Sequence, residues 1–226
     1  MPDLPPRSAY PDTRAWLRAL PALPGSPAVD PGPIPAQPST LFLRWLEEAV
    51  MAGEPEPQTT VLSTATATGD VDARVLILKD VDKRGWWFSG TTDSPKGRQL
   101  AANAAAALTF YWPGLGRQVR VRGRVEAGPA EVSARDYLER SVTARAVAAA
   151  SSQSEPLVDE AEYDRAIAAT VARIEADPGY VAPGWQAWCL VPDSVEFWLA
   201  DPGRRHRRWR YRRAVPTGWS TETLWP

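Results

Sequence analysis

The sequence predicts a mainly β protein with helical additions, built as a small β-barrel. Six or seven segments have strand patterns, with β-branched or alternating apolar residues bounded by turn residues. The few helical patterns between them lack the regular strand–helix alternation of a doubly wound sheet. An apolar fraction of 44% and 11 tryptophans among 226 residues are sufficient for one sizeable core.

The first 37 residues form a proline-rich arm that precedes this domain. Ten prolines fall in the stretch, and proline removes backbone donors and blocks helix interiors. We expect residues 1–37 to be mostly extended or disordered, with one short helical turn at Thr13–Leu20. The arm is either a plain tail or a ligand for a groove-binding module. Residues 38–226 are expected to form the folded domain.

A packing helix opens the folded domain. Ser39 or Thr40 can cap it, apolar residues recur at helical spacing as far as Ala49, and Gly53 ends it. Strands are expected next at 59–68, 74–79 and 86–88, then at 104–112 and 117–126. The last strands are expected at 186–190, 194–199 and 204–213, with helices at 129–140 and 159–176 and a small polar loop at 146–154.

Two stretches carry cations in positions that suit an anionic ligand. The run from Arg74 to Lys79 encloses four apolar residues, which predicts a buried strand with a cation free at each end; alternatively, these charges only reach out to water. Ser94 and the following proline predict a helix start, where free amides, the helix dipole and Lys96 or Arg98 favour a phosphate.

A third cationic stretch lies near the C-terminus, where seven arginines and the chain's single histidine fall between Arg204 and Arg213. In a strand, Arg204, His206 and Arg208 would share one face with the arginines that follow at every second position. Arginine forks bind phosphate and stack on planar rings, so this face suits an anionic aromatic ligand. The alternative is a solvated basic edge strand.

Composition excludes several classes of protein. A net charge of −1 provides no overall attraction to nucleic acid or anionic membranes. One cysteine and one histidine make a conventional zinc site untenable, so no metal is expected. The absence of an apolar run of membrane length, of a signal-peptide pattern and of paired cysteines predicts a cytoplasmic protein.

The order of motifs resembles the pyridoxine/pyridoxamine 5′-phosphate oxidase family of FMN-binding split barrels over residues 40–226. The motifs that carry the resemblance are Arg74 to Lys79, Ser94-Pro95-Lys96-Gly97, Arg117-Gln118-Val119, Gln153-Ser154, Glu196-Phe197-Trp198 and Arg204-x-His206-x-Arg208. The resemblance implies an FMN-binding split β-barrel that works as a homodimer, with residues 185–226 as a segment for dimerisation and substrate binding.

FMN is the cofactor that the resemblance implies. The implied FMN contacts are Arg74, Val75, Leu76, Ile77, Leu78, Lys79, Ser89, Gly90, Ser94, Lys96, Gln118, Gln153, Ser154, Trp198 and Arg208. Arg74 and Lys96 would hold the FMN phosphate with Ser94 beside them. Gln153 and Ser154 would come from the partner subunit.

The implied substrate is a phosphorylated pyridine. Its contacts would be Lys79, Tyr137, Arg140, Arg204 and His206. Lys79 and Arg140 would clamp the substrate phosphate, while Arg204 and His206 would cover the ring and act as the catalytic residues.

Several positions depart from the family pattern. Ser89-Gly90 replaces a tyrosine-threonine pair, and Pro95 replaces an arginine. Tyr137 lies one residue closer to Arg140 than the family spacing. Ala144 replaces a serine, and Arg207 replaces an aspartate. The FMN half of the site therefore matches the family better than the substrate half.

The implied reaction is oxidation of pyridoxamine or pyridoxine 5′-phosphate to pyridoxal 5′-phosphate, with O₂ as the electron acceptor. Three alternatives remain open at this level. They are a related flavin oxidase for another reduced aromatic such as a dihydrophenazine, a non-enzymatic flavin- or heme-binding split barrel, and a nucleic-acid-binding module that uses the arginine strand.

Overall fold

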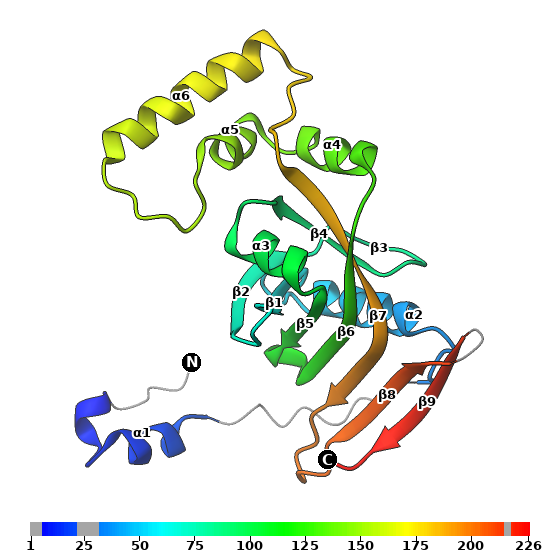
Figure 1. The fold of residues 1–226 in the computed structure, drawn as a ribbon. Helices are drawn as coiled ribbons and strands as arrows, with labels where there is room; N and C mark the ends of the chain where they lie inside the picture. Colours follow the sequence, from blue (N-terminus) through cyan, green and yellow to red (C-terminus); the bar gives the residue numbers. More distant parts are fainter. Residues whose placement is uncertain (1–5, 22–31, 215–217) are drawn as a thin grey trace.

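The computed structural model describes residues 6–21, 32–214 and 218–226. Within them, antiparallel strands form one curled nine-stranded sheet with the path β2-β1-β5-β6-β7-β4-β3, and β8 and β9 continue from β7 (Figure 1). The strands are β1 (Thr59–Ala65), β2 (Val71–Ile77), β3 (Asp80–Val81), β4 (Trp86–Thr91), β5 (Ala105–Trp112), β6 (Arg117–Ala127), β7 (Trp185–Leu199), β8 (Arg207–Arg213) and β9 (Trp219–Leu224). This curled sheet with added helices confirms the predicted fold class.

The helices lie around the sheet. They are α1 (Thr13–Ala19), α2 (Pro38–Met51), α3 (Pro95–Ala102), α4 (Ala130–Leu138), α5 (Val142–Ala150) and α6 (Glu160–Ala176), with short 3₁₀ turns at Arg7–Ala9 and Pro113–Leu115. Helices α4, α5 and α6 gather at one end of the long strands β6 and β7, and the β8–β9 hairpin lies at the other end (Figure 1). None of the helices in the described ranges has the length and apolar character of a membrane span.

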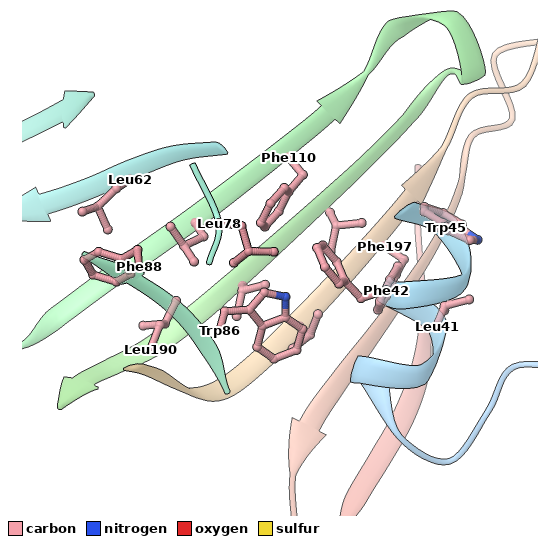
Figure 2. Close-up of a cluster of buried hydrophobic side chains, with 14 of the residues drawn as sticks. Leu41, Phe42, Trp45, Leu62, Leu78, Trp86, Phe88, Phe110, Leu190 and Phe197 are labelled. Carbon is pink, nitrogen blue, oxygen red and sulfur yellow. The ribbon is translucent and has the colours of Figure 1, made fainter. Parts of the chain in front are cut away.

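The core is built between α2 and the inner face of the sheet. Phe42 of α2 lies edge-on to Phe110 and Trp86, with ring centroids 4.7 and 5.5 Å apart, and Trp45 meets Phe197 at 5.2 Å (Figure 2). These five side chains are at most 1% exposed. Buried aromatic pairs add to the stabilisation from area burial, so they fix how the sheet curls around α2.

The first helices and strands follow the prediction closely. Helix α1 covers most of the predicted turn, and Asp12 caps it by accepting a hydrogen bond from the Ala15 amide at 2.7 Å. The rest of the arm's predicted disorder falls largely on residues 1–5 and 22–31, which lie outside the described residues. Helix α2 starts one residue before the predicted caps, because Pro38 occupies the first turn, where a missing amide costs nothing.

Three later predictions are wrong. Most of the predicted loop at 146–154 belongs to helix α5, which Ser141 caps; its alanine-rich sequence has no strong apolar period. The two strands predicted at 186–190 and 194–199 are one strand, β7, and a register shift opposite Arg122 and Gly123 lets it run through Pro192. Strand β8 starts only at Arg207, and β9 was not predicted.

The apolar run 75–78 is not the buried strand that its sequence predicts. Val75 is 66% exposed and Ile77 is 46% exposed, whereas Leu78 is 8% exposed and belongs to the core. The reason is the position of β2 at the edge of the sheet, beyond β1, where one face has no layer to cover it. An exposed apolar edge of this kind is typical of a surface that binds a ligand or another chain.

Candidate active site

A cavity of about 590 Å³ lies beside the exposed edge strand β2. Its walls come from β2, β4, the start of α3, the segment from the end of α4 through α5, and the start of β7. The lining residues are Arg74, Val75, Leu76, Ile77, Lys79, Ser89, Gly90, Thr91, Lys96, Arg140, Ser141, Thr143, Ala144, Val147, Ala148, Ser151, Gln153 and Trp185. Apolar walls with a few converging cations are typical of a site for a small anionic ligand.

Lys96 lies at one end of the cavity, which we call the Lys96 pole. Ser94 caps α3 by accepting from the Gly97 amide at 3.2 Å, and the Lys96 Nζ donates to Ser94 Oγ at 3.2 Å and to Gln153 Oε1 at 2.7 Å. Lys96 is only 6% exposed, and burial lowers its pKa to about 8, with the nearby Arg74 charge acting in the same direction. A buried ammonium held by neutral partners at a helix start is suited to an anion.

Gly90 and Arg74 complete this pole. A Cβ on Gly90 would lie 2.6 Å from Lys96 Cε, so a larger residue here would displace the end of the lysine side chain. The Arg74 guanidinium donates to Thr64 Oγ1 at 2.5 Å and to Asp72 Oδ2 at 2.7 Å, which fixes its direction. The cavity wall therefore presents two cations close together, one of them largely buried.

The second pole combines two cations with one carboxylate. The Arg140 guanidinium stacks over the Trp185 ring, 4.7 Å from its centroid, and Lys79 Nζ lies 3.8 Å from Asp136 Oδ1. Asp136 is held from its other oxygen, because Trp185 Nε1 donates to Oδ2 at 2.9 Å. This pole therefore carries less net positive charge than its two cations suggest.

Three polar atoms at the cavity wall are buried without a hydrogen-bond partner among the described residues. They are Ser89 Oγ, Thr91 Oγ1 and Arg140 Nε. Buried polar groups are nearly always hydrogen-bonded, so unused groups at a cavity wall indicate that a ligand supplies the partners. With the two cations and the apolar strand, these groups fit a ligand that has a phosphate, a polar chain and a flat ring, as FMN has.

The structure brings most of the predicted FMN residues together. Nine of them line the cavity, namely Arg74, Val75, Leu76, Ile77, Lys79, Ser89, Gly90, Lys96 and Gln153, and the predicted substrate residue Arg140 lines it as well. Ser94 lies directly behind Lys96, and Ser154 is an exposed neighbour of Gln153 with a φ of +70°. Leu78 belongs to the core and does not line the cavity, because alternation along the chain points it to the other face.

A second group of predicted residues lies at the opposite end of β7. It comprises Gln118, Trp198, Arg204, His206 and Arg208, and none of them lines the cavity. Trp198 follows Trp185 of the cavity by thirteen residues of one strand, which at about 3.3 Å per residue is roughly 40 Å. One chain therefore cannot bring both groups to the same ligand.

This second group is internally ordered. The Trp198 and His206 rings lie 4.8 Å apart, and His206 Nδ1 accepts a hydrogen bond from the Asp201 amide at 3.1 Å. A neutral imidazole that accepts at Nδ1 carries its proton on Nε2, which leaves Nε2–H as a donor. Arg208 is held by Glu196 through two hydrogen bonds of 3.1 and 2.7 Å. Arg204 is exposed, with a φ of +64° in the turn before β8.

The arginines beyond Arg208 are largely engaged in the sheet. Arg210 and Arg212 both donate to Glu222 of β9, at 2.7 and 2.8 Å, and Arg213 donates to the Pro192 carbonyl at 2.9 Å. Arg210 and Arg212 thus tie β8 to β9, and Arg213 ties the hairpin to β7. They offer little support for a nucleic-acid surface.

Two predicted contacts need correction. Gln153 was expected to come from the partner subunit, but it bonds Lys96 of its own chain, because α5 folds back over the start of α3. Tyr137 was expected to contact the substrate, but it is 0% exposed and its hydroxyl donates to the Arg145 carbonyl at 2.8 Å. The one-residue shift relative to Arg140 turns its ring away from the cavity.

Several lining residues were not singled out from the sequence. Thr143, Val147, Ala148 and Ser151 come from or adjoin α5, the helix that the sequence analysis missed. Asp136 and Trp185 were also missed. If 142–150 had been predicted as a helix, its spacing would have placed the α5 lining residues on one face. No local sequence pattern indicates that Trp185 stacks against Arg140.

Replacing Tyr137 with phenylalanine is expected to lower the free energy of unfolding by about 1 kcal/mol, the usual contribution of one buried hydrogen bond. Ligand binding in the cavity should not change. Denaturant unfolding and substrate KM measure the two effects separately. A raised KM at unchanged stability would restore Tyr137 as a substrate contact.

The geometry defines the class of the protein: a split barrel with a cation-lined cavity beside its edge strand β2 and a second cluster of predicted ligand residues at the far end of β7. The sequence model described as pyridoxamine 5′-phosphate oxidase matches residues 46–177, and that of the pyridoxine 5′-phosphate oxidase C-terminal dimerisation region matches residues 185–226. The chain belongs to the pyridoxamine 5′-phosphate oxidase family.

Individual relatives agree with this assignment. A pyridoxine/pyridoxamine 5′-phosphate oxidase of Burkholderia multivorans is 43% identical over 191 residues, which is 84% of this chain and 89% of the relative. The crystal structure of PhzG from Burkholderia lata in complex with tetrahydrophenazine-1-carboxylic acid has a TM-score of 0.79 and 33% identity, covering 85% of this chain and 94% of that chain. An FMN-binding protein from Nostoc punctiforme, at 18% identity and a TM-score of 0.69, shares the fold, covering 85% of this chain and all of that chain.

Proposed function

We propose that this protein is an FMN-dependent oxidase whose active site is completed by a second copy of the chain. The observation that carries the proposal is the cavity beside β2, with buried Lys96, unused polar groups and an exposed apolar strand in one place. The matched dimerisation region supports a homodimer, which the distance between the cavity and the second group also requires.

The residues of the cavity divide into two tasks. Lys96, Arg74 and the α3 amides hold the FMN phosphate, where charge-assisted hydrogen bonds are strongest. Val75 and Ile77 of β2 cover the ring with apolar surface. Gln118, Trp198 and Arg208 of the second copy hold the ring from the other side.

Substrate orientation falls to the second pole and to the β7–β8 turn. Lys79 and Arg140 bind the anionic substituent of the substrate. Arg204 and His206 of the second copy lie over the substrate ring, with His206 Nε2–H as a donor toward it. Such fixed donors position the reacting carbon and stabilise charge that develops there. FMN, when bound, would supply the redox chemistry, the transfer of two electrons from the substrate to O₂.

The first candidate substrate is pyridoxamine or pyridoxine 5′-phosphate, with pyridoxal 5′-phosphate as product, as the curated relatives are named. The second candidate is a reduced tricyclic aromatic acid, in keeping with the ligand named for PhzG. The α5 wall favours the second candidate, since Ala144, Val147 and Ala148 offer apolar surface between the hydroxyl-bearing residues Thr143 and Ser151.

A visible spectrum of the purified protein tests the proposal directly. Flavin absorption bands, or their appearance when FMN is added, are expected. Peroxide release in air is then measured with pyridoxamine 5′-phosphate, pyridoxine 5′-phosphate and a dihydrophenazine carboxylate. Failure to bind FMN would refute the oxidase proposal, and turnover of only the tricyclic acid would select the second substrate.

FMN affinity is expected to fall above pH 8. The pKa of Lys96 is about 8 in the chain without ligand, and the phosphate dianion favours the protonated amine. Below pH 8 the amine is already charged; above pH 8 binding must take up a proton, so Kd rises toward tenfold per pH unit. Fluorescence titration with FMN from pH 7 to 9.5 measures this slope. Lys96→Arg should flatten it, because arginine stays charged.

A further inference from the structure

Behind the second pole of the cavity lies a carboxylate, Asp136, that the FMN-oxidase assignment does not use. Asp136 lies on α4, four residues before Arg140, so the two residues share one face of the chain as α4 ends. Its side chain is 15% exposed, and both of its oxygens are engaged, one by Trp185 at 2.9 Å and one beside Lys79 at 3.8 Å. The carboxylate is therefore fixed behind the cavity wall, against the lining residues Lys79 and Trp185.

The charge at this pole is set by these three residues. Lys79 and Arg140 contribute two positive charges, and Asp136 removes one of them. By contrast, the carboxylates that oppose the two cations of the Lys96 pole are Asp72, whose side chain is 52% exposed, and Asp93, which is also exposed. Water screens an exposed carboxylate much more effectively than a mostly buried one. The two poles therefore favour anions of different charge.

The hydrogen-bond donors available at the second pole also favour an anion of lower charge. Lys79 already faces Asp136, and the nearby wall presents Ala144, Val147 and Ala148 together with the hydroxyls of Ser141 and Thr143. Arg140 is free to donate from Nε, which has no partner among the described residues, while Trp185 stacks against the guanidinium plane and holds it. A planar guanidinium fork matches the two oxygens of one carboxylate, whereas a phosphate needs donors for three oxygens.

We propose that the Lys79–Asp136–Arg140 pole selects a planar aromatic substrate bearing a single carboxylate over one bearing a phosphate dianion. The selection rests on the proposed FMN-oxidase function and names the substrate class for that site. Asp136 acts as the discriminating residue: it repels the second negative charge of a phosphate and leaves Arg140 to bind a monoanion. Apolar α5 then covers the ring system.

A matched pair of probes tests this selection in the FMN-loaded protein. The probes are 1-naphthoate and 1-naphthyl phosphate, which share a ring system and carry one and two negative charges at pH 8. Binding is followed by the change in flavin absorbance, without turnover. Wild type is expected to bind the carboxylate at least about tenfold more tightly than the phosphate. Asp136→Asn is expected to reduce this preference about tenfold, chiefly by strengthening phosphate binding.

Glu139→Gln is the control, because Glu139 is an exposed carboxylate near the end of the same helix, whereas Asp136 alone of the two pairs with Lys79 and accepts from Trp185. It should leave the preference unchanged. Tighter phosphate binding by wild type, binding of neither probe, or an equal effect of the two substitutions would each overturn the proposal. The wild-type comparison stands alone if Asp136→Asn fails to fold. Loss of FMN binding, in contrast, would refute the oxidase function itself and is seen before any probe is added.

Discussion

Replacing Lys96 with alanine is expected to weaken FMN binding by roughly 100-fold, about 2.7 kcal/mol. The amine is 6% exposed and lies at the capped start of α3, where a phosphate would meet a desolvated charge. Hydrogen bonds to such charges are stronger than those at the surface. The purified variant should be colourless, and fluorescence titration should give the change in Kd.

Lys83→Ala is the matched control for this experiment. Lys83 is an exposed lysine in the hairpin between β3 and β4, and it does not line the cavity. Its loss should leave FMN affinity within about twofold of wild type, because exposed charges are screened by water and salt. Equal weakening by both substitutions would show that overall charge, and not the Lys96 position, governs binding.

Two inactive variants are expected to restore activity when they are mixed. Lys96→Ala damages the cavity, and Arg204→Ala damages the group at the far end of β7, so each homodimer has two faulty sites. In a heterodimer both faults fall in one site and the other is intact. Random reassociation makes half of the dimers mixed, each with one of two sites working, so about a quarter of wild-type activity should return.

The mixing experiment needs dissociation and reassociation of the subunits, followed by peroxide measurement. Arg204→Ala alone should retain FMN while turnover falls by about 100-fold or more, since it removes only substrate orientation. The control mixture combines Lys96→Ala with Gly90→Ala, two faults of the same cavity, and should remain inactive. If the test mixture reassociates without recovering activity, each active site is built from one chain alone. Recovery in the control would mean that its two substitutions do not damage the same cavity.

The local predictions that succeeded rest on local rules. Ser94 before a proline at a helix start predicts the cap that the structure shows, and alternation of valines in β6 predicts the core face. The order of motifs along the chain likewise predicted the family and the split barrel, which the matched family models confirm. Most of the predicted cavity residues were also correct, because they lie in or next to a strand or helix that the sequence predicts.

The sequence by itself determined the strands, the helix caps and the family, since periodicity and capping depend on neighbours in the chain. Only the tertiary structure decided what depends on distant contacts. In the folded chain Val75 and Ile77 are exposed at a sheet edge, and Tyr137 is buried against Arg145. Gln153 bonds to Lys96 of the same chain, and Asp136 lies between Lys79 and Trp185. It also separated Trp198 from the cavity by the length of β7, because a strand is rigid and extended.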